Sequence, residues 1–187
     1  MSKVNLVLMS LFLLSLIIGS SNLCQATLTQ WKDNGHYYEV VNAIGISWPD
    51  ARDAAQSSSY LEFQGYLVSI TSETENVFVT NLLDDKNGWA GGYQPIGSPE
   101  PSGNWQWVSG EPWGYSNWRT LEPNNNNGNE DCLDLNGVNT VWFGGWNDLP
   151  YDSESNLSCY VVEYPVPEPA TLLLLGLGAV ILRKRRK

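Results

Sequence analysis

The chain of 187 residues is long enough for one domain with further segments at its ends, and its formal net charge at pH 7 is −10. Nine tryptophans and an aromatic content of 12% provide a hydrophobic core and exclude an intrinsically disordered protein. Between residues 27 and 166 there are four basic and nineteen acidic residues, so this part should avoid nucleic acid and anionic membranes and could use a cation such as calcium.

Residues 1–26 are predicted to be a secretory signal peptide. Lys3 precedes a long apolar run, and the small-residue exit "CQA" ends at Ala26. We expect cleavage after Ala26. Lipidation of Cys24 is disfavoured, because Leu23 stands where a lipoprotein signal requires a small residue.

The first regular elements are a strand and a helix. The β-branched and aromatic stretch "GHYYEVV" at 35–41 predicts a strand. In "SWPDARDAAQSS" a helix should follow, with Ser47 as N-cap, Pro49 in the first turn and Asp50 near the helix start. The apolar stretch "YLVSI" at 66–70 predicts a short buried strand.

A second helix is predicted in "TSETENVFVTNLLDD". Its start has the capping-box pattern Ser72-x-x-Glu75. Its apolar stripe should consist of Val77, Phe78 and Leu82, and Asn87-Gly88 should end it.

After Gly88 no further helix is predicted, and short apolar pieces alternate with loops rich in Gly, Pro, Ser and Asn. Two early helices followed by short strands predict an α+β fold with an antiparallel sheet. The connection from about Ser98 to Asn129 is too long to be passive in so small a domain. His36, the only histidine, should be structural. The tryptophans at 105, 107, 118 and 146 should pack in the core.

The stretch "LEPNNNNGNEDC" at 121–132 gathers oxygen-bearing side chains and has almost nothing to bury. Alone it fits a solvated turn. Together with "WND" at 146–148 it suggests a calcium site, because calcium accepts about six to eight oxygen ligands in flexible geometry. A carboxylate accepts from a sugar hydroxyl while an asparagine amide donates to one, so mixed Glu and Asn ligands could also hold a sugar. Three pieces carry the candidate ligands: Glu122-Pro123-Asn124, Glu130-Asp131 and Asn147-Asp148.

These motifs resemble the C-type lectin domain. "EPN", then "NEDC" with Glu130 eight residues after Glu122, and then "WND" are similar to that family's calcium and sugar signature. "GWAGGY" resembles its WIGL-type strand, and "SWPDARDAAQ", "YLVSITSETEN" and "YSNW" follow in family order. The resemblance covers roughly His36 to Tyr164, and we predict a domain at 27–165.

The resemblance implies that Ca²⁺ is bound by Glu122, Asn124, Glu130, Asn147 and Asp148. It implies that the first four of these residues also bind the sugar. It implies a C-type lectin-like fold with a long calcium-binding loop and a cis peptide between Glu122 and Pro123. The order "EPN", rather than "QPD", resembles members that prefer mannose-like sugars with equatorial 3- and 4-hydroxyls. The segment between Glu130 and Asn147 is longer than is usual in the family, with "GVNTVWFGG" inserted.

The cysteines depart from the family pattern of two disulfides. Ala55 and Val162 stand where one pair is usual, and Tyr151 stands at the position that would hold the partner of Cys132. By this resemblance we expect a shifted disulfide between Cys132 and Cys159.

The C-terminal segment 166–187, "VPEPATLLLLGLGAVILRKRRK", resembles the PEP-CTERM sorting signal through Pro167, Glu168 and Pro169. A helix over the apolar run 170–182 would span only about 20 Å, against about 30 Å for a hydrocarbon core, so it suits transient inner-membrane anchoring. The resemblance implies processing by an exosortase-type enzyme and export to the cell surface or matrix.

The sequence bears on three function classes. The prediction is calcium-dependent binding of carbohydrate, with exopolysaccharide or a surface glycan as the partner. The alternative is a structural or protein-binding matrix component on the same fold. An enzyme is disfavoured, because the sequence has no second histidine, nucleophile elbow or phosphate loop, and its paired carboxylates fit a metal site better.

Overall fold

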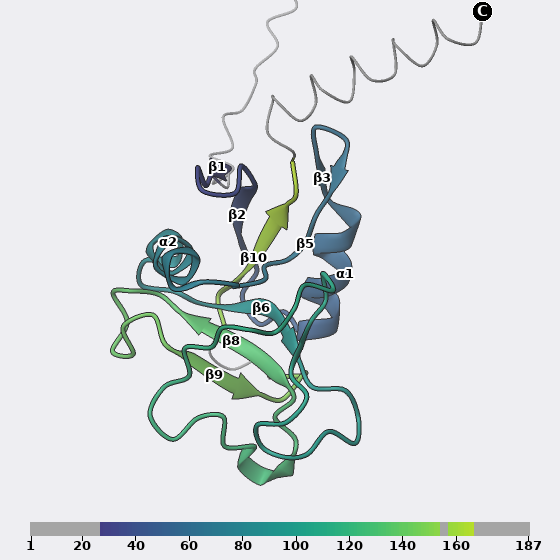
Figure 1. Cartoon of the computed structure of the whole chain (residues 1–187), viewed down its shortest axis with the longest axis vertical. Coiled ribbons are helices and arrows are strands. Elements are labelled where there is room, and N and C mark those ends of the chain that lie inside the picture. The colour runs from purple at the N-terminus through teal and green to yellow at the C-terminus, as the bar shows by residue number, and fades with distance from the viewer. Residues whose placement is uncertain (1–26, 154–156, 167–187) are drawn as a thin grey trace, which may run out of the picture.

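The computed structural model of the protein describes residues 27–153 and 157–166. The predicted signal peptide at 1–26 and the sorting motif Pro167, Glu168 and Pro169 lie outside these residues. Two helices, α1 (Trp48–Ser57) and α2 (Glu73–Leu83), lie on opposite sides of the strands (Figure 1). The predicted α+β class is therefore confirmed. Within the described part, no helix is both long and apolar enough to cross a membrane.

Most strands form one mixed sheet in the order β1-β2-β10-β6-β8-β9, with β5 paired to β10 and β7 paired to β6. A strand between two neighbours of opposite direction must run parallel to one of them. Accordingly β10 is antiparallel to β2 and parallel to β6, whereas the sequence predicted antiparallel pairing only. The strands are β1 (Thr29–Gln30), β2 (Tyr37–Asn42), β5 (Tyr66–Leu67), β6 (Asn87–Tyr93), β7 (Gln106–Trp107), β8 (Cys132–Asn136), β9 (Trp146–Leu149) and β10 (Cys159–Tyr164), with β3 (Ser59–Tyr60) and β4 (Phe63–Gln64) as a separate pair.

Helix α1 begins as predicted. The Ser47 hydroxyl accepts a hydrogen bond of 3.3 Å from the backbone N–H of Asp50, and Pro49 lies in the first turn, where its missing N–H costs no helical bond. The helix buries Trp48, Ala51 and Ala55 against the sheet.

Helix α2 has a modified capping box. The Ser72 hydroxyl accepts from the backbone N–H of Glu75 at 3.2 Å. The Glu75 carboxylate reaches past Ser72 and accepts from the backbone N–H and the hydroxyl of Thr71, at 2.7 and 2.8 Å. The Ser72 hydroxyl thus satisfies an N–H that the helix start leaves unpaired, and Glu75 fixes the residue that precedes the cap.

The predicted end and apolar stripe of α2 were partly wrong. The helix ends at Leu83, and its C-cap residue Asp84 has a positive φ of 58°. Asn87 and Gly88 already belong to β6. Val77 is 53% exposed, because the buried side of the helix is set by Asn76, Val79, Thr80 and Leu83.

The core has two clusters, one associated with each helix. The cluster with Trp48 and Ala51 of α1 includes Leu67 and Val162. The cluster with Val79 and Leu83 of α2 includes Ile70, Leu133, Leu135 and three fully packed tryptophans, Trp105, Trp107 and Trp146, with Trp118 partly buried at its edge. The prediction that these four tryptophans pack in the core is confirmed.

The predicted Cys132–Cys159 disulfide was wrong, and both cysteines are buried free thiols. The sheet register explains why. Cys159 lies opposite Gly88 of β6, whereas Cys132 lies opposite Tyr93, five residues further along that strand. At about 3.3 Å per residue the two cysteines are offset by roughly 16 Å, more than the roughly 7 Å between Cα atoms that a disulfide tolerates.

His36 has a structural role, as predicted. Its Nδ1 lies 2.6 Å from Oε1 of Glu163, a carboxylate that is 1% exposed. Glu163 also accepts from the backbone N–H of Ser69 at 3.1 Å and from the hydroxyl of Tyr38 at 3.3 Å. These bonds join β2 and β10 to the segment before α2 and satisfy an otherwise costly buried charge.

Candidate functional site

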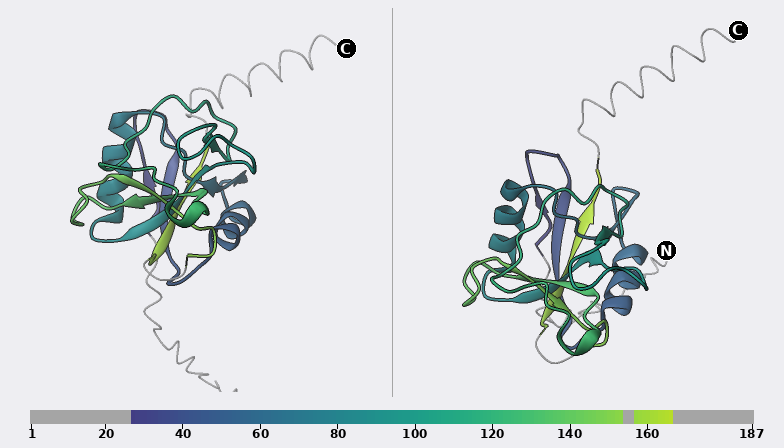
Figure 2. Two further views of the ribbon diagram at one scale, coloured as in Figure 1. Left: turned by 90° about the horizontal axis from the view of Figure 1, so that it is seen from below. Right: turned by 60° about the horizontal axis from the view of Figure 1, so that its bottom comes forward.

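The long connection between β7 and β8 brings the predicted ligand residues to β9. It carries the short 3₁₀ helix η1 (Asn126–Gly128), at the end of the domain away from β3 (Figures 1 and 2). The backbone N–H groups of Asn124 and Asn125 donate to the two carboxylate oxygens of Asp148, at 3.1 and 2.8 Å. Glu122 and Asn124 are thereby held beside Asn147 and Asp148, which are neighbours on β9.

The asparagines after Asn124 build an ordered turn. Asn125 and Asn127 have positive φ angles of 46° and 58°, a conformation that asparagine tolerates better than most residues. The Asn125 side-chain oxygen accepts from the backbone N–H of Glu130 at 3.0 Å, and Glu130 in return accepts from the N–H of Asn126 at 2.7 Å. This turn brings Glu130 back toward the other candidate ligands.

The site also contains an arginine that the sequence motifs did not reveal. From Nη2, Arg119 donates to Oε1 of Glu122 at 3.2 Å and, by a short bond, to Oδ1 of Asn147. Its Nη1 donates to Asn136 at 3.2 Å. The sequence did carry a signal for this residue. Arg119 is one of four basic residues between residues 27 and 166, and it lies three positions before Glu122.

Backbone pairing places Arg119 in the site. The N–H of Arg119 donates to the carbonyl of Trp146 at 3.0 Å, and the N–H of Trp146 donates to the carbonyl of Asn117 at 2.9 Å. Segment 117–119 thus runs along the start of β9, and the Arg119 side chain reaches Asn147, the next residue of that strand.

Negative charge in the site exceeds the positive charge. Burial and the neighbouring Asp148 raise the pKa of Glu122, although Arg119 opposes the shift. Burial also raises the pKa of Glu130, with further contributions from Asp148 and Glu122. Oε2 of Glu122 is buried without a hydrogen-bond partner. One guanidinium therefore leaves the three carboxylates only partly compensated.

Comparison with known proteins identifies the family of this domain. A family model described as the lectin C-type domain matches residues 44–161, more than half of the chain. The chain belongs to the C-type lectin domain family. A second family model, the PEP-CTERM protein-sorting motif, matches residues 165–187.

Relatives of this C-type lectin domain come from distant organisms. A lectin of Pleurodeles waltl is 34% identical over 131 residues, which cover 67% of this chain and 69% of that protein. The low affinity immunoglobulin epsilon Fc receptor of Mus musculus is 32% identical over 127 residues, 68% of this chain, but the match spans only 33% of the receptor. The match to halomucin of Haloquadratum walsbyi, 32% identical over 144 residues and 70% of this chain, spans 1% of that protein.

Solved C-type lectins have the same fold. The C-type lectin CEL-I from Cucumaria echinata superposes with a TM-score of 0.60 at 25% identity, covering 76% of this chain and 97% of that one. The cow carbohydrate-recognition domain of CD23, solved in the presence of a GlcNAc2Man3 oligosaccharide, gives a TM-score of 0.55 at 29% identity and covers 68% and 86% of the two chains.

The candidate site fits a hard cation in its donor chemistry. All five predicted ligands offer carboxylate or amide oxygens, which calcium prefers, and the buried unpartnered oxygen of Glu122 is a free acceptor. In the described residues, however, no three carboxylate, histidine or cysteine side chains are already grouped for a metal. Arg119 engages one oxygen each of Glu122 and Asn147 instead. Backbone N–H groups engage both carboxylate oxygens of Asp148 and one of Glu130. Oε1 of Glu122 and Oδ1 of Asn147 could bind calcium fully only after Arg119 releases them, whereas Oε2 of Glu122 is free of the arginine.

Proposed function

We propose that this domain binds carbohydrate through a calcium ion held by Glu122, Asn124, Glu130, Asn147 and Asp148. The observation that supports the proposal best is the convergence of Glu122, Asn147 and Asp148 from two separate segments, with one carboxylate oxygen of Glu122 buried and unpartnered. Calcium would supply the positive charge that the three carboxylates lack and a contact for sugar hydroxyls.

The proposed ligand is a mannose- or glucose-type sugar. Glu122 would accept from one hydroxyl and Asn124 would donate to it, and Glu130 and Asn147 would do the same for its neighbour. The "EPN" order supports this class, as does the mannose-containing oligosaccharide present with the CD23 domain. Family membership also supports binding in preference to catalysis.

The proposed location is the cell surface or extracellular matrix. The sorting motif matched at 165–187 supports export, with an exosortase-type enzyme as processing partner. A millimolar site contributes only about −4 kcal/mol, so many displayed copies would be needed for adhesion. An exopolysaccharide or surface glycan, with its repeating units, suits such multivalent binding.

One observation favours a second candidate function. Arg119 already neutralises part of the site and bonds to Glu122 and Asn147. A domain in which this arginine replaces calcium permanently would serve as a structural or protein-binding component of the matrix.

Binding of residues 27–166 to an immobilised glycan panel separates the two candidates. The domain is tested with calcium, with chelator, and as the double variant Glu122→Gln, Asn124→Asp. Calcium-dependent binding to mannose- or glucose-type sugars, weakened or redirected by the double change, establishes the lectin function. Absence of binding to every glycan, with no calcium-dependent rise in Tm, supports the structural candidate.

A further inference from the structure

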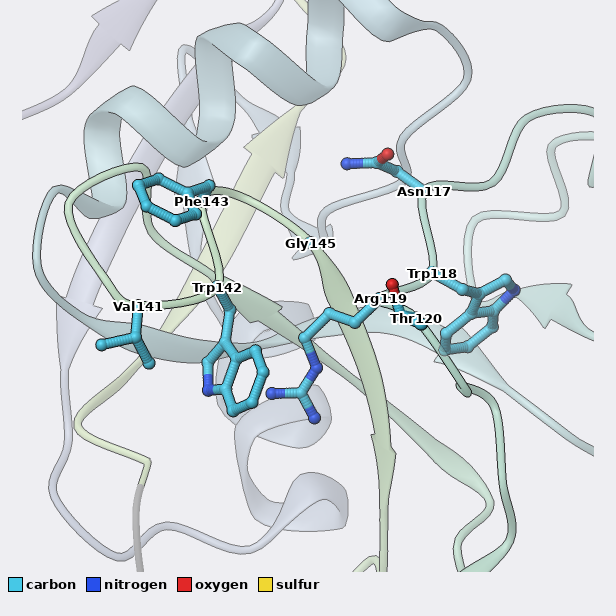
Figure 3. A pocket seen from close by; sticks show the side chains of 8 residues that line it. All are labelled: Asn117, Trp118, Arg119, Thr120, Val141, Trp142, Phe143 and Gly145. Carbon is cyan, nitrogen blue, oxygen red and sulfur yellow. The ribbon is translucent and has the colours of Figure 1, made fainter.

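A pocket of about 320 Å³ lies beside the candidate calcium site (Figure 3). It is an open pocket, bounded by residues 141–143 and 145 of the loop between β8 and β9 and by the segment 117–120. One wall is apolar and the other is mainly polar. The side chains that matter for its chemistry are Asn117, Arg119, Thr120, Val141, Trp142 and Phe143.

The pocket is preformed, because its loop is tied to the rest of the domain. The carbonyl of Gly144 accepts from the side-chain amides of Asn117 and Asn76, at 3.1 and 3.3 Å. The backbone N–H of Gly145 donates to the carbonyl of Trp142 at 3.0 Å. A Cβ at Gly145 would lie 2.6 Å from Cγ of Arg119, so only glycine lets the loop approach this closely.

Three successive apolar side chains of the loop are left in solvent. Val141, Trp142 and Phe143 are 77%, 52% and 81% exposed. Exposed large apolar side chains gathered on one loop mark a ligand groove or another interaction surface. Aromatic walls with a few polar groups opposite them are typical of small-molecule pockets, which begin at about 300 Å³.

The pocket and the candidate calcium site share one side chain. The Arg119 guanidinium lies 4.3 Å from the ring centroid of Trp142, and the same guanidinium bonds to Glu122. Figure 3 shows the indole of Trp142 and the Arg119 guanidinium side by side. A chain of sugar residues leaving the calcium site on this side would therefore enter the pocket directly.

We propose that this pocket is a second sugar subsite, which takes the adjoining neutral hexose residue of an oligosaccharide or polysaccharide. The apolar C–H face of the sugar would lie on Trp142 and Phe143, and its hydroxyls would meet Asn117 and Thr120. This proposal rests on the proposed lectin function and extends it from one sugar residue to two.

The charge of the domain indicates a neutral ligand. Between residues 27 and 166 four basic residues stand against nineteen acidic ones, so an anionic polysaccharide would be repelled. Arg119, the cation of the pocket, is already hydrogen-bonded to Glu122, Asn136 and Asn147.

The experiment compares two probes by titration calorimetry in calcium: methyl α-mannopyranoside and an α-linked mannotriose. The protein is the full chain, purified in mild detergent. We expect the triose to bind at least about tenfold more tightly, beyond the roughly threefold statistical gain of three repeated units. Trp142→Ala and Phe143→Ala should each reduce this gain severalfold and change the affinity for the single sugar less than about twofold.

Controls distinguish loss of the subsite from loss of folding or of any exposed apolar side chain. Leu61→Ala removes an exposed apolar side chain at the β3–β4 turn, far from β9 (Figure 1), and should leave the gain intact. Phe143→Ala keeps the Trp142 ring beside Arg119. If this variant also reduces the gain for the triose, a folding or positioning defect confined to Trp142→Ala cannot explain the reduction. An unchanged calcium-dependent Tm verifies that each variant is folded.

Three outcomes would overturn the subsite. If the wild type and both variants show the same gain in affinity from the single sugar to the triose, the subsite proposal is wrong. The lectin function would still stand, because the single sugar is bound. Binding of neither sugar would remove both proposals. Conversion of a wild-type dimer into a monomer by Trp142→Ala, without a change in the triose gain, would assign the apolar side chains to a second copy of the chain.

Discussion

Arg119 and Glu122 form an ion pair of 3.2 Å inside the predicted calcium site, and neither side chain is more than 15% exposed. The same guanidinium also bonds to Asn147. Two of the five predicted calcium ligands are therefore held by a cation that belongs to the chain itself. Arg119 and calcium cannot both engage these oxygens fully, so the arginine should compete with the metal.

Replacement of Arg119 by Gln should tighten calcium binding by roughly tenfold, which corresponds to about 1.4 kcal/mol. The variant loses the competing charge and keeps a polar side chain. Calcium titration followed by calorimetry and by Tm measures both effects, with the Tm without calcium expected to fall because the carboxylates lose their compensation.

Arg52→Gln is the matched control, because Arg52 also lies over a tryptophan, Trp48, and pairs with a carboxylate, Asp53. It should leave calcium affinity unchanged. Weaker calcium binding in Arg119→Gln would show instead that the arginine organises the ligands.

Asn76 should stabilise the strand that carries Asn147 and Asp148. Its side-chain oxygen accepts from the buried indole N–H of Trp146 at 2.6 Å, and its amide donates to Gly144 at 3.3 Å. Asn76→Ala removes this partner from the indole N–H of Trp146 and from the carbonyl of Gly144. We therefore expect a loss of about 3 kcal/mol in the free energy of unfolding. Urea unfolding measures it.

Asn81→Ala, at an exposed position of the same helix, controls for helix propensity and should change stability by less than about 0.5 kcal/mol. Similar losses in the two variants would mean that the bond to Trp146 contributes little.

Stability should fall as the pH rises from about 6 to 9, through His36. The hydrogen bond to Glu163 raises the pKa of His36 above 6.5, despite burial. The protonated form is favoured in the folded state, so the stabilisation is complete below about pH 6.5 and is lost as the pH passes the raised value. Burial raises the pKa of Glu163 as well. Ionisation of this carboxyl as the pH rises therefore also lowers the stability of the fold.

His36→Gln should cost about 1.5–3 kcal/mol near pH 6, and its difference from the wild type should narrow toward pH 9. Tyr164→Phe removes a hydrogen bond of 2.6 Å to Glu39 on the same strand pair. Since the pKa of Tyr164 is raised to about 12, its effect should stay constant over this range. A His36→Gln difference that is equally constant would contradict the argument.

Cys132 and Cys159 should react as two free thiols after unfolding. Alkylation in denaturant without reductant, followed by intact mass, should add two labels to residues 27–166. In the folded protein labelling should be slow, because burial raises the pKa of both thiols, that of Cys159 to about 11. A mass with no added label would restore the predicted disulfide and require a different strand register.

Local sequence patterns were sufficient for the helix starts and the fold class. Ser47 and Ser72 cap the helices that they were predicted to begin, because a capping side chain and its N–H partner lie within one turn. The "EPN", "NEDC" and "WND" motifs likewise identified the segments that meet at the site, and with the other motifs they led to the C-type lectin family.

Tertiary structure decided what depends on strand register and on the path of long loops. The register of β6 separates Cys132 from Cys159, and residues this far apart in sequence carry no local signal of their offset. Pairing of segment 117–119 with the start of β9 places Arg119 against Asn147, and the folded loop before β9 adds Trp142 to the other side of that arginine. The sequence by itself determined which side chains could offer oxygen ligands to a cation. The fold decided which of these side chains lie together and that Arg119 lies among them.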